Sequence, residues 1–351
     1  LRLITEKNPL PFITGTICAH NCMTKCMRNY YDEPVNIRAT KLVAAEKGYD
    51  AYMSKITPPA PVTDGRKVAV IGGGPTGMSA AYFVGRAGIP VTLFEKADRL
   101  GGIVRQVIPA FRISDEAIDK DVALMEKMGV EVKLNTEAPS VAELKAQGYT
   151  HIFFAVGAWK AGRLDIHGNV VPVIGWLRDM KAGKDVSLGH VAVVGGGNTA
   201  MDAARAALRA GAKSSTLVYR RTKKYMPADA EELEMAIADG VEFLELVAPV
   251  EQKDGKLICE KMKLGDPDDK GRRKPVPTGE MVEIPCDTVV SAVGEKVESE
   301  VFTRNGITVD EKGIPAFKTN LEGVYAGGDA MRGPATVVEG IADAQYFANA
   351  V

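Results

Sequence analysis

The residues best suited to chemistry near the start of this sequence are glycines. Gly72, Gly74 and Gly77 have the spacing G-x-G-x-x-G, and Pro75 lies between them. In this pattern the first glycine permits a tight turn, the second lets the backbone approach a pyrophosphate, and the third lets a helix pack closely on a strand. The free N–H groups at the start of that helix attract phosphate. The spacing predicts a dinucleotide site.

An acidic residue follows where this motif binds a ribose. One short apolar run, Val68 to Ile71, precedes the glycines, and a second, Val91 to Phe94, ends in Glu95. A carboxylate at that point can accept hydrogen bonds from an adenosine ribose. Strand, glycines, helix, strand and acid together favour dinucleotide binding over a glycine-rich structural turn.

The same pattern restarts later in the chain. Gly195, Gly197, Asn198, Thr199 and Ala200 belong to a G-x-G-x-x-A turn, the permitted variant of the motif, after another buried apolar run. Two such turns predict two dinucleotide sites in one chain.

The second unit ends differently from the first. Arg220 and Arg221 stand where the first unit has Glu95. A carboxylate would repel a ribose 2′-phosphate, whereas paired guanidinium groups bind it with bidentate hydrogen bonds. The alternative is two solvated arginines at the end of a strand. Their position within the motif favours NADPH over NADH.

Cysteines form a third cluster. Cys18, Cys22 and Cys26 are closely spaced around His20, and on a helix the three thiols would share one face. This distribution indicates metal ligands, and iron–sulfur ligation in particular, more than a disulfide framework. The alternative is a small buried thiol cluster. With the nucleotide motifs, the cysteine usage favours a reducing, cytoplasmic setting.

The elements that position these residues alternate between buried strands and helices, which predicts an α/β fold. The 351 residues suffice for about two or three domains. A net charge of −1 gives no reason to expect nucleic acid or an anionic membrane surface as a partner. No apolar run approaches the roughly 18 residues of a membrane helix.

Near the C-terminus, Gly327, Gly328 and Asp329 make a family resemblance specific. The chain resembles the flavoproteins that bind two dinucleotides, and within them the glutamate synthase small subunit and the N-terminal half of dihydropyrimidine dehydrogenase. Around the cysteines it is most similar to the flavin and iron–sulfur subunit proposed for selenate reductase. The other motifs that carry the resemblance are 108–112, 195–202, 219–222 and the cysteine run.

The resemblance implies a set of cofactor ligands, position by position. FAD would be bound by Gly72, Gly74, Pro75, Gly77, Glu95, Gly102, Arg112, Gly328 and Asp329. NADPH would be bound by Gly195, Gly197, Asn198, Thr199, Arg220, Arg221 and Gly294. Cys18, Cys22 and Cys26 would ligate an iron–sulfur cluster of the 4Fe–4S type, and because three ligands do not complete such a site, we expect it to be incomplete in this chain.

The resemblance also implies the domain plan. Two Rossmann-like domains would follow a small helical domain, 1–61, which carries the cysteines and is expected to be truncated. The FAD-binding domain would comprise 62–161 and 291–351, and the NADPH-binding domain, 162–290, would be inserted between these parts.

The function that this implies is an NAD(P)H-dependent flavoprotein oxidoreductase. Electrons would pass from NADPH through FAD to iron–sulfur clusters, and then to a partner subunit or domain that carries the terminal substrate site. The cofactors carry this chemistry, so no catalytic acid or base is expected.

Three other functions are compatible with parts of the pattern. A disulfide reductase needs a cysteine pair near Gly101 and Gly102, but no cysteine occurs between Cys26 and Cys259. A flavin monooxygenase would share the fold, although the cysteine run argues against it. A docking or scaffold subunit would bind FAD without passing electrons.

Overall fold

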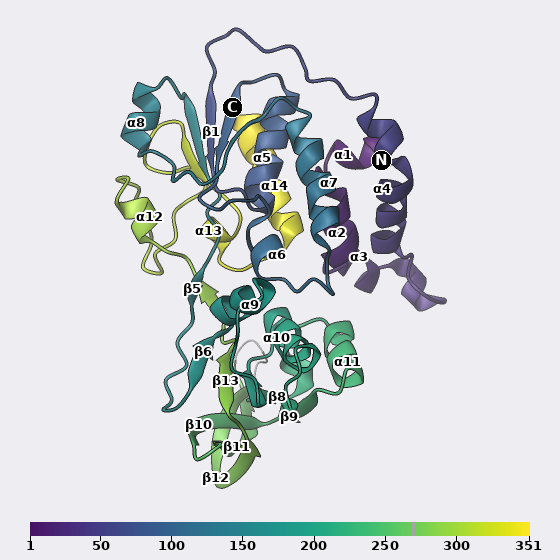
Figure 1. Cartoon of the computed structure of the whole chain (residues 1–351), viewed down its shortest axis with the longest axis vertical. Coiled ribbons are helices and arrows are strands. Elements are labelled where there is room, and N and C mark those ends of the chain that lie inside the picture. Colours follow the sequence, from purple (N-terminus) through teal and green to yellow (C-terminus); the bar gives the residue numbers. More distant parts are fainter. Residues whose placement is uncertain (269–270, 272) are drawn as a thin grey trace. The chain divides into compact units, whose positions relative to one another are not determined.

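The chain contains two compact units. The structure, a computed structural model, describes residues 1–268, 271 and 273–351. The first unit comprises Leu1–Gln106, Ala110–Lys160 and Lys296–Val351, and the second comprises Val107–Pro109 and Ala161–Glu295 (Figure 1). The second unit is therefore an insertion in the sequence of the first.

The first unit begins with helices that carry the cysteine segment. α2 (Pro11–Ile17) packs against α4 (Ile37–Met53), and α4 starts at Asn36, whose side chain accepts a hydrogen bond from the Ala39 N–H. The other elements of this segment are α1 (Arg2–Thr5), α3 (Asn21–Thr24) and the 3-10 turn η1 (Met27–Tyr30).

A parallel five-stranded sheet forms the centre of the first unit. Its order is β15-β4-β1-β2-β3. The strands are β1 (Val68–Ile71), β2 (Val91–Phe94), β3 (Glu131–Lys133), β4 (His151–Phe154) and β15 (Val324–Ala326). Every residue of β1 and β2 is buried, as continuous apolar runs in a parallel sheet require.

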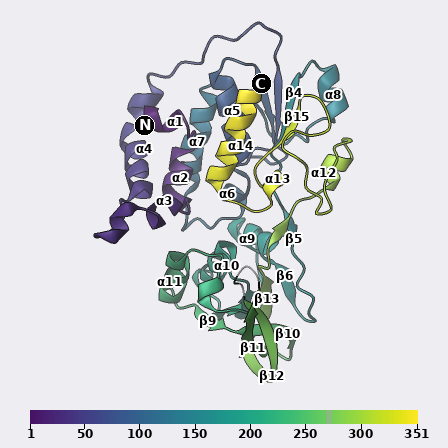
Figure 2. The ribbon, with the colours of Figure 1, turned by 180° about the vertical axis from the view of Figure 1, so that it is seen from behind.

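Two helices that are far apart in this unit's sequence lie side by side (Figures 1 and 2). They are α5 (Pro75–Arg86) and α14 (Val337–Ala350). Phe347 of α14 stacks on Phe153 of β4, with 4.4 Å between ring centroids. The remaining helices are α6 (Gly102–Gln106), α7 (Asp115–Glu126), α8 (Val141–Ala146), α12 (Glu300–Thr303) and α13 (Asp329–Arg332).

The second unit repeats the plan with another parallel five-stranded sheet, in the order β6-β13-β7-β8-β9. Its strands are β6 (Val170–Pro172), β7 (His190–Val194), β8 (Ser214–Tyr219), β9 (Glu242–Glu245) and β13 (Thr288–Ser291). Its helices are α9 (Val173–Lys181), α10 (Asn198–Arg209), α11 (Ala230–Ala238) and the 3-10 turn η2 (Lys223–Tyr225). The predicted α/β fold with two Rossmann-like domains and a helical, cysteine-containing start is confirmed.

Smaller sheets complete the chain. An antiparallel sheet contains β10 (Val247–Lys253), β11 (Lys256–Pro267) and β12 (Arg273–Pro285), and a two-stranded sheet contains β5 (Lys160–Ala161) and β14 (Glu295–Lys296).

Two charged segments lie near these elements. The acidic segment 226–239 is helical only from Ala230, where α11 begins, and 223–225 forms the turn η2. Strands β11 and β12 extend into the charged segment 266–274, of which 269, 270 and 272 lie outside the described residues. Within the part of the chain described, no helix is both long and apolar enough to cross a bilayer.

Candidate dinucleotide and metal sites

The first glycine turn connects β1 to α5. A Cβ atom on Gly72, which has φ +105°, would lie 2.5 Å from the Ala155 carbonyl oxygen, and one on Gly77 would lie 1.8 Å from the Gly72 carbonyl oxygen. Side chains at both positions would collide with backbone, so the turn and the close helix packing require glycine. Gly102 packs on Gly74, because a Cβ on Gly102 would lie 2.8 Å from the Gly74 Cα.

The start of α5 is free to meet an anion. Gly74 is the residue before the helix and supplies no side-chain cap, and Pro75 occupies the first turn. The N–H groups of that turn therefore have no side chain competing for them, and they carry the positive end of the helix dipole.

Glu95 lies directly beside this turn. It follows β2, is 7% exposed, and its carboxylate accepts hydrogen bonds from the N–H groups of Gly73, at 2.6 Å, and Ala97, at 2.8 Å. The structure thus brings the predicted acid and the predicted glycines together.

The C-terminal glycines meet the same turn. Cβ atoms on Gly328, which has φ +64°, and on Gly340 would each lie 2.3 Å from the Thr76 Oγ1 in the first turn of α5. Asp329 begins α13, and its Oδ1 accepts a hydrogen bond from the Ala335 N–H at 3.1 Å. Residues distant in sequence therefore converge at the start of α5.

A buried aspartate holds this C-terminal segment in place. Asp343 of α14 is 1% exposed; its Oδ2 accepts hydrogen bonds from the Gly328 N–H at 2.9 Å and the Arg332 Nε at 2.8 Å. Arg332 Nη2 donates to the other oxygen at 2.6 Å. The sequence analysis missed Asp343 and Thr76; an isolated aspartate on the apolar face of α14 was the available signal for the first.

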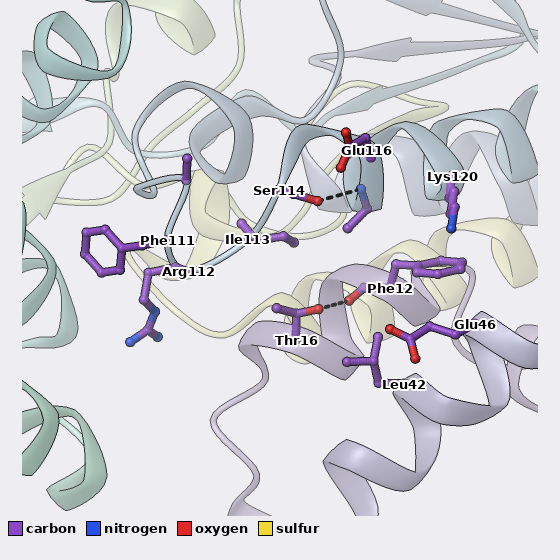
Figure 3. Close-up of a pocket in the computed structure, with 12 residues that line it drawn as sticks. Phe12, Thr16, Leu42, Glu46, Phe111, Arg112, Ile113, Ser114, Glu116 and Lys120 are labelled. Atoms are coloured by element: carbon purple, nitrogen blue, oxygen red, sulfur yellow. Dashed lines mark hydrogen bonds between the residues drawn. The ribbon is translucent and has the colours of Figure 1, made fainter.

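Arg112 lines a cavity of about 320 Å³ within the first unit. Figure 3 shows α2 and α4 on one side of it and the segment around Ser114 on the other. Glu46, Glu116 and Lys120 bring charges of both signs to its wall, and Phe12 contributes an aromatic face. The wall of the cavity therefore combines charges of both signs with an aromatic face, so the cavity is not simply an anion-binding site.

The second glycine turn connects β7 to α10. A Cβ on Gly195 would lie 2.3 Å from the Ala292 carbonyl oxygen, whereas no atom lies within 4 Å of the position a Cβ on Gly197 would take. Gly197 precedes α10 and supplies no side-chain cap, and Thr199 lies in the first turn. The chain is tightly packed at Gly195 and open at Gly197, and this combination suits the close approach of a pyrophosphate.

Arg220 and Arg221 follow β8, at the same edge of this sheet. Arg220 is exposed and Arg221 is partly buried. The Arg221 Nε is buried and has no hydrogen-bond partner among the residues that the structure describes. An unsatisfied buried guanidinium N–H is costly, and an anion would satisfy it. Gly294 has φ +103° and open space on its Cβ side.

The cysteine run is not one continuous helix, so the condition under which its three thiols would share a helical face is not met. Cys18 and Cys26 have extended backbone, Cys22 lies in α3, and His20 between them has φ +38°. Over the described residues, no group of three or more His, Cys, Asp or Glu side chains is arranged to hold a metal ion.

The pKa values of three thiols are shifted, in opposite directions. Hydrogen bonds from the backbone of Val35 and Arg28 lower the pKa of Cys26 below its ordinary value. Burial raises the pKa of Cys259 to about 12 and that of Cys286 to about 11. The last two therefore behave as buried apolar side chains.

Comparison with known proteins identifies the family. Residues 66–344 match the model of the family described as pyridine nucleotide-disulphide oxidoreductase. The chain belongs to this family.

Individual relatives agree with this assignment. The chain is 42% identical to "Putative oxidoreductase YgfK" of Escherichia coli over 362 residues, which cover 100% of this chain and 35% of that protein. It therefore spans about a third of that relative's length. It is 32% identical to the small chain of an NADPH glutamate synthase of Halomonas elongata, covering 95% of this chain and 78% of the relative.

A solved structure agrees on the fold. FprA of Mycobacterium tuberculosis in complex with NADPH matches with a TM-score of 0.67 and 21% identity, over 81% of this chain and 83% of that one. The suspected relationship to the glutamate synthase small chain is confirmed, and the chain is an NAD(P)H-dependent flavoprotein oxidoreductase module.

Proposed function

We propose that this module takes a hydride from NADPH onto FAD and delivers the electrons to iron–sulfur clusters and an electron-accepting partner domain or subunit. One contrast carries the proposal. Glu95 directly follows the strand after the first glycine turn, whereas Arg220 and Arg221 directly follow the strand after the second. The first arrangement suits the ribose of FAD, and the second suits the 2′-phosphate of NADPH.

FAD would be held by a domain made of 62–161 and 291–351, most of which lies in the first unit. The uncapped start of α5, with Gly74 and Pro75, would meet the pyrophosphate. Glu95 would exchange its bond to the Gly73 N–H for one to a ribose hydroxyl. The other proposed contacts are Gly72, Gly77, Gly102, Arg112, Gly328 and Asp329.

NADPH would be held by the inserted domain, 162–290, together with Gly294. The uncapped start of α10 would bind its pyrophosphate, through Gly195, Gly197, Asn198 and Thr199. The unpartnered Nε of Arg221, with Arg220, would bind the 2′-phosphate.

The chemistry comes from the cofactors and the orientation comes from the protein. A flavin accepts a hydride as a two-electron carrier and can release electrons singly. The side chains named here bind and orient the two dinucleotides, and none is assigned a proton transfer. A disulfide reaction is not proposed, since no cysteine occurs between Cys26 and Cys259.

The cysteine run, in the helical segment 1–61, is assigned only a partial ligand set. Cys18, Cys22 and Cys26 supply fewer thiolates than the four that a cubane cluster usually takes, and in this conformation they do not converge. The small-chain name of one relative supports an association with an electron-accepting subunit.

Anaerobic addition of NADPH to the FAD-loaded chain tests the proposal. The flavin absorbance should bleach without any added partner, and acid-released cofactor should be FAD rather than FMN, because Glu95 is positioned for an adenosine ribose. A flavin that stays oxidised under excess NADPH would instead identify a scaffold subunit.

A further inference from the structure

The turn that contains Arg220 and Arg221 is held in place by hydrogen bonds to the rest of its unit. We call residues 220–225 the basic turn, because Arg220, Arg221, Lys223 and Lys224 lie in it. It follows β8 and ends in the 3-10 turn η2. Four cations so close together repel one another, so an ordered turn needs contacts that hold it.

Tyr219, the last residue of β8, provides one such contact. Its hydroxyl donates a hydrogen bond to the Tyr225 carbonyl oxygen at 2.7 Å, and its side chain is largely buried. The ring packs against the second glycine turn: a Cβ on Gly196 would lie 2.5 Å from it. One side chain thus contacts both the turn suited to a pyrophosphate and the turn suited to a 2′-phosphate.

The end of β9 holds the basic turn from the other side. The Glu245 carboxylate accepts a hydrogen bond from the Lys223 N–H at 2.8 Å, and the Leu246 N–H donates to the Arg221 carbonyl oxygen at 3.1 Å. Leu246 has φ +58°, a left-handed conformation that is uncommon for a branched residue and costs free energy. The contacts around Leu246 therefore hold it in this conformation.

The segment that follows the basic turn is hydrogen-bonded to the second glycine turn. The Ala228 N–H donates to the Gly196 carbonyl oxygen at 3.0 Å, and the Asp229 N–H donates to the Asn198 Oδ1 at 3.1 Å. With its backbone held at these points, the basic turn can present the unpartnered Arg221 Nε without first becoming ordered. Such preorganisation lowers the entropic cost of binding.

We propose that Tyr219 is a positioning residue for cofactor choice: its hydroxyl holds the basic turn so that Arg220 and Arg221 meet the 2′-phosphate of NADPH. This inference rests on the proposed function of the second unit as the NADPH site. It adds a residue that would not touch the phosphate itself and that acts through the arginines.

The test is Tyr219→Phe in the full chain, which removes the hydroxyl and keeps the ring. Ferricyanide reduction is followed with NADPH and with NADH. The KM for NADPH should rise about three- to tenfold, the range expected for one hydrogen bond, while kcat and the KM for NADH stay unchanged. Tyr149→Phe is the matched control, because its buried hydroxyl bonds the Thr92 Oγ1 at 2.9 Å in the first unit; it should alter neither KM.

A double-mutant cycle separates positioning from general support of the fold. In an Arg220→Ala/Arg221→Ala background, Tyr219→Phe should have no further effect on the KM for NADPH. An equal rise in both KM values, full additivity with the arginine changes, or no effect of Tyr219→Phe would overturn the inference. A wild-type chain that uses NADH as well as NADPH would instead overturn the NADPH assignment, and this inference with it.

Discussion

At the scale of single residues, the proposed cofactor assignment rests on the residues that follow one strand in each unit. Glu95 and Arg220 occupy corresponding points after β2 and β8, yet their environments differ. Glu95 is buried and bonded to the backbone of the glycine turn, while Arg220 is exposed and the buried Arg221 Nε has no hydrogen-bond partner in the described part of the chain. A neutral ribose and a charged 2′-phosphate call for these opposite environments.

The arginine pair gives the first prediction. Arg220→Ala with Arg221→Ala should raise the KM for NADPH about ten- to hundredfold and leave the KM for NADH nearly unchanged. The reason is the loss of charge-assisted hydrogen bonds, worth roughly 1.5–3 kcal/mol. Steady-state kinetics with both nucleotides measures this, and an equal response to the two would show that the arginines are a solvated face.

At the scale of elements, single carboxylates join helices that sequence patterns treat as separate. Asp121 of α7 is fully buried, and its two oxygens accept hydrogen bonds from the N–H groups of Phe12, at 3.1 Å, and Ile13, at 2.8 Å, in the first turn of α2. It caps a helix more than a hundred positions away. Burial raises the pKa of Asp121, and the two N–H donors oppose that rise.

Removing this cap should loosen α2. Asp121→Ala leaves two buried N–H groups unsatisfied, so the free energy of unfolding should fall by about 2–4 kcal/mol. Hydrogen exchange should accelerate at the Phe12 and Ile13 amides. Asp121→Asn retains one acceptor oxygen and should lose less; amides that stay protected in the alanine variant would refute the capping role.

A second carboxylate joins α10 to α11. Asp239 Oδ2 accepts hydrogen bonds from the Arg205 Nε and the Arg209 Nη2, both at 2.8 Å. The bond from Arg205 lowers the pKa of Asp239 below the ordinary 3.8. The stabilisation is therefore fully present above about pH 4 and is lost as the pH falls through the lowered pKa.

The variant Asp239→Asn tests this linkage. It should reduce the free energy of unfolding at pH 7 by about 1–3 kcal/mol and flatten the fall in stability below pH 4. Denaturant titrations from pH 2.5 to 7 measure both effects. Asp179→Asn is the control: Asp179 pairs with Lys184 in the same unit but on the surface, so stability should not change. Identical pH profiles of wild type and Asp239→Asn would contradict the assignment.

At the scale of the whole molecule, the two units resemble each other in design but only one begins with the cysteine segment. Each has a parallel sheet of five strands, a glycine turn and an uncapped helix start. The cysteine segment lies in the first unit, which also holds the proposed FAD site. Electron transfer from the flavin would therefore depend on whether this segment can form a complete cluster.

We predict that the 351-residue chain binds FAD and NADPH but holds little intact cluster. Three thiols that do not converge cannot replace the four ligands of a cubane site. Iron and acid-labile sulfide should be assayed after anaerobic reconstitution, together with the electron paramagnetic resonance of the reduced protein. About four irons per chain would mean that a further ligand lies within this sequence.

Local patterns were sufficient to predict the glycine turns and the residues after their strands. Gly72 needs a positive φ and Gly77 needs a missing side chain, and both are properties of a short segment that the sequence displays directly. Buried apolar runs likewise predicted β1 and β7, because a strand between two layers is apolar throughout.

The cysteine spacing left the local conformation undecided. A period of four places the thiols on one face only if the segment is helical, but Cys18 and Cys26 have extended backbone and His20 is left-handed. A short helix gains too few hydrogen bonds to repay its nucleation, so spacing alone does not make one.

Only the tertiary structure decided which distant residues meet. Amino-acid types determined that a turn would form between β1 and α5, but not that Gly328 would lie against Thr76 or that Asp343 would bond the Gly328 N–H. Nor did they reveal that Asp121 caps α2. A buried polar group must find a partner, yet its own sequence neighbourhood does not say which one, because the partner is chosen by the packing of the whole unit.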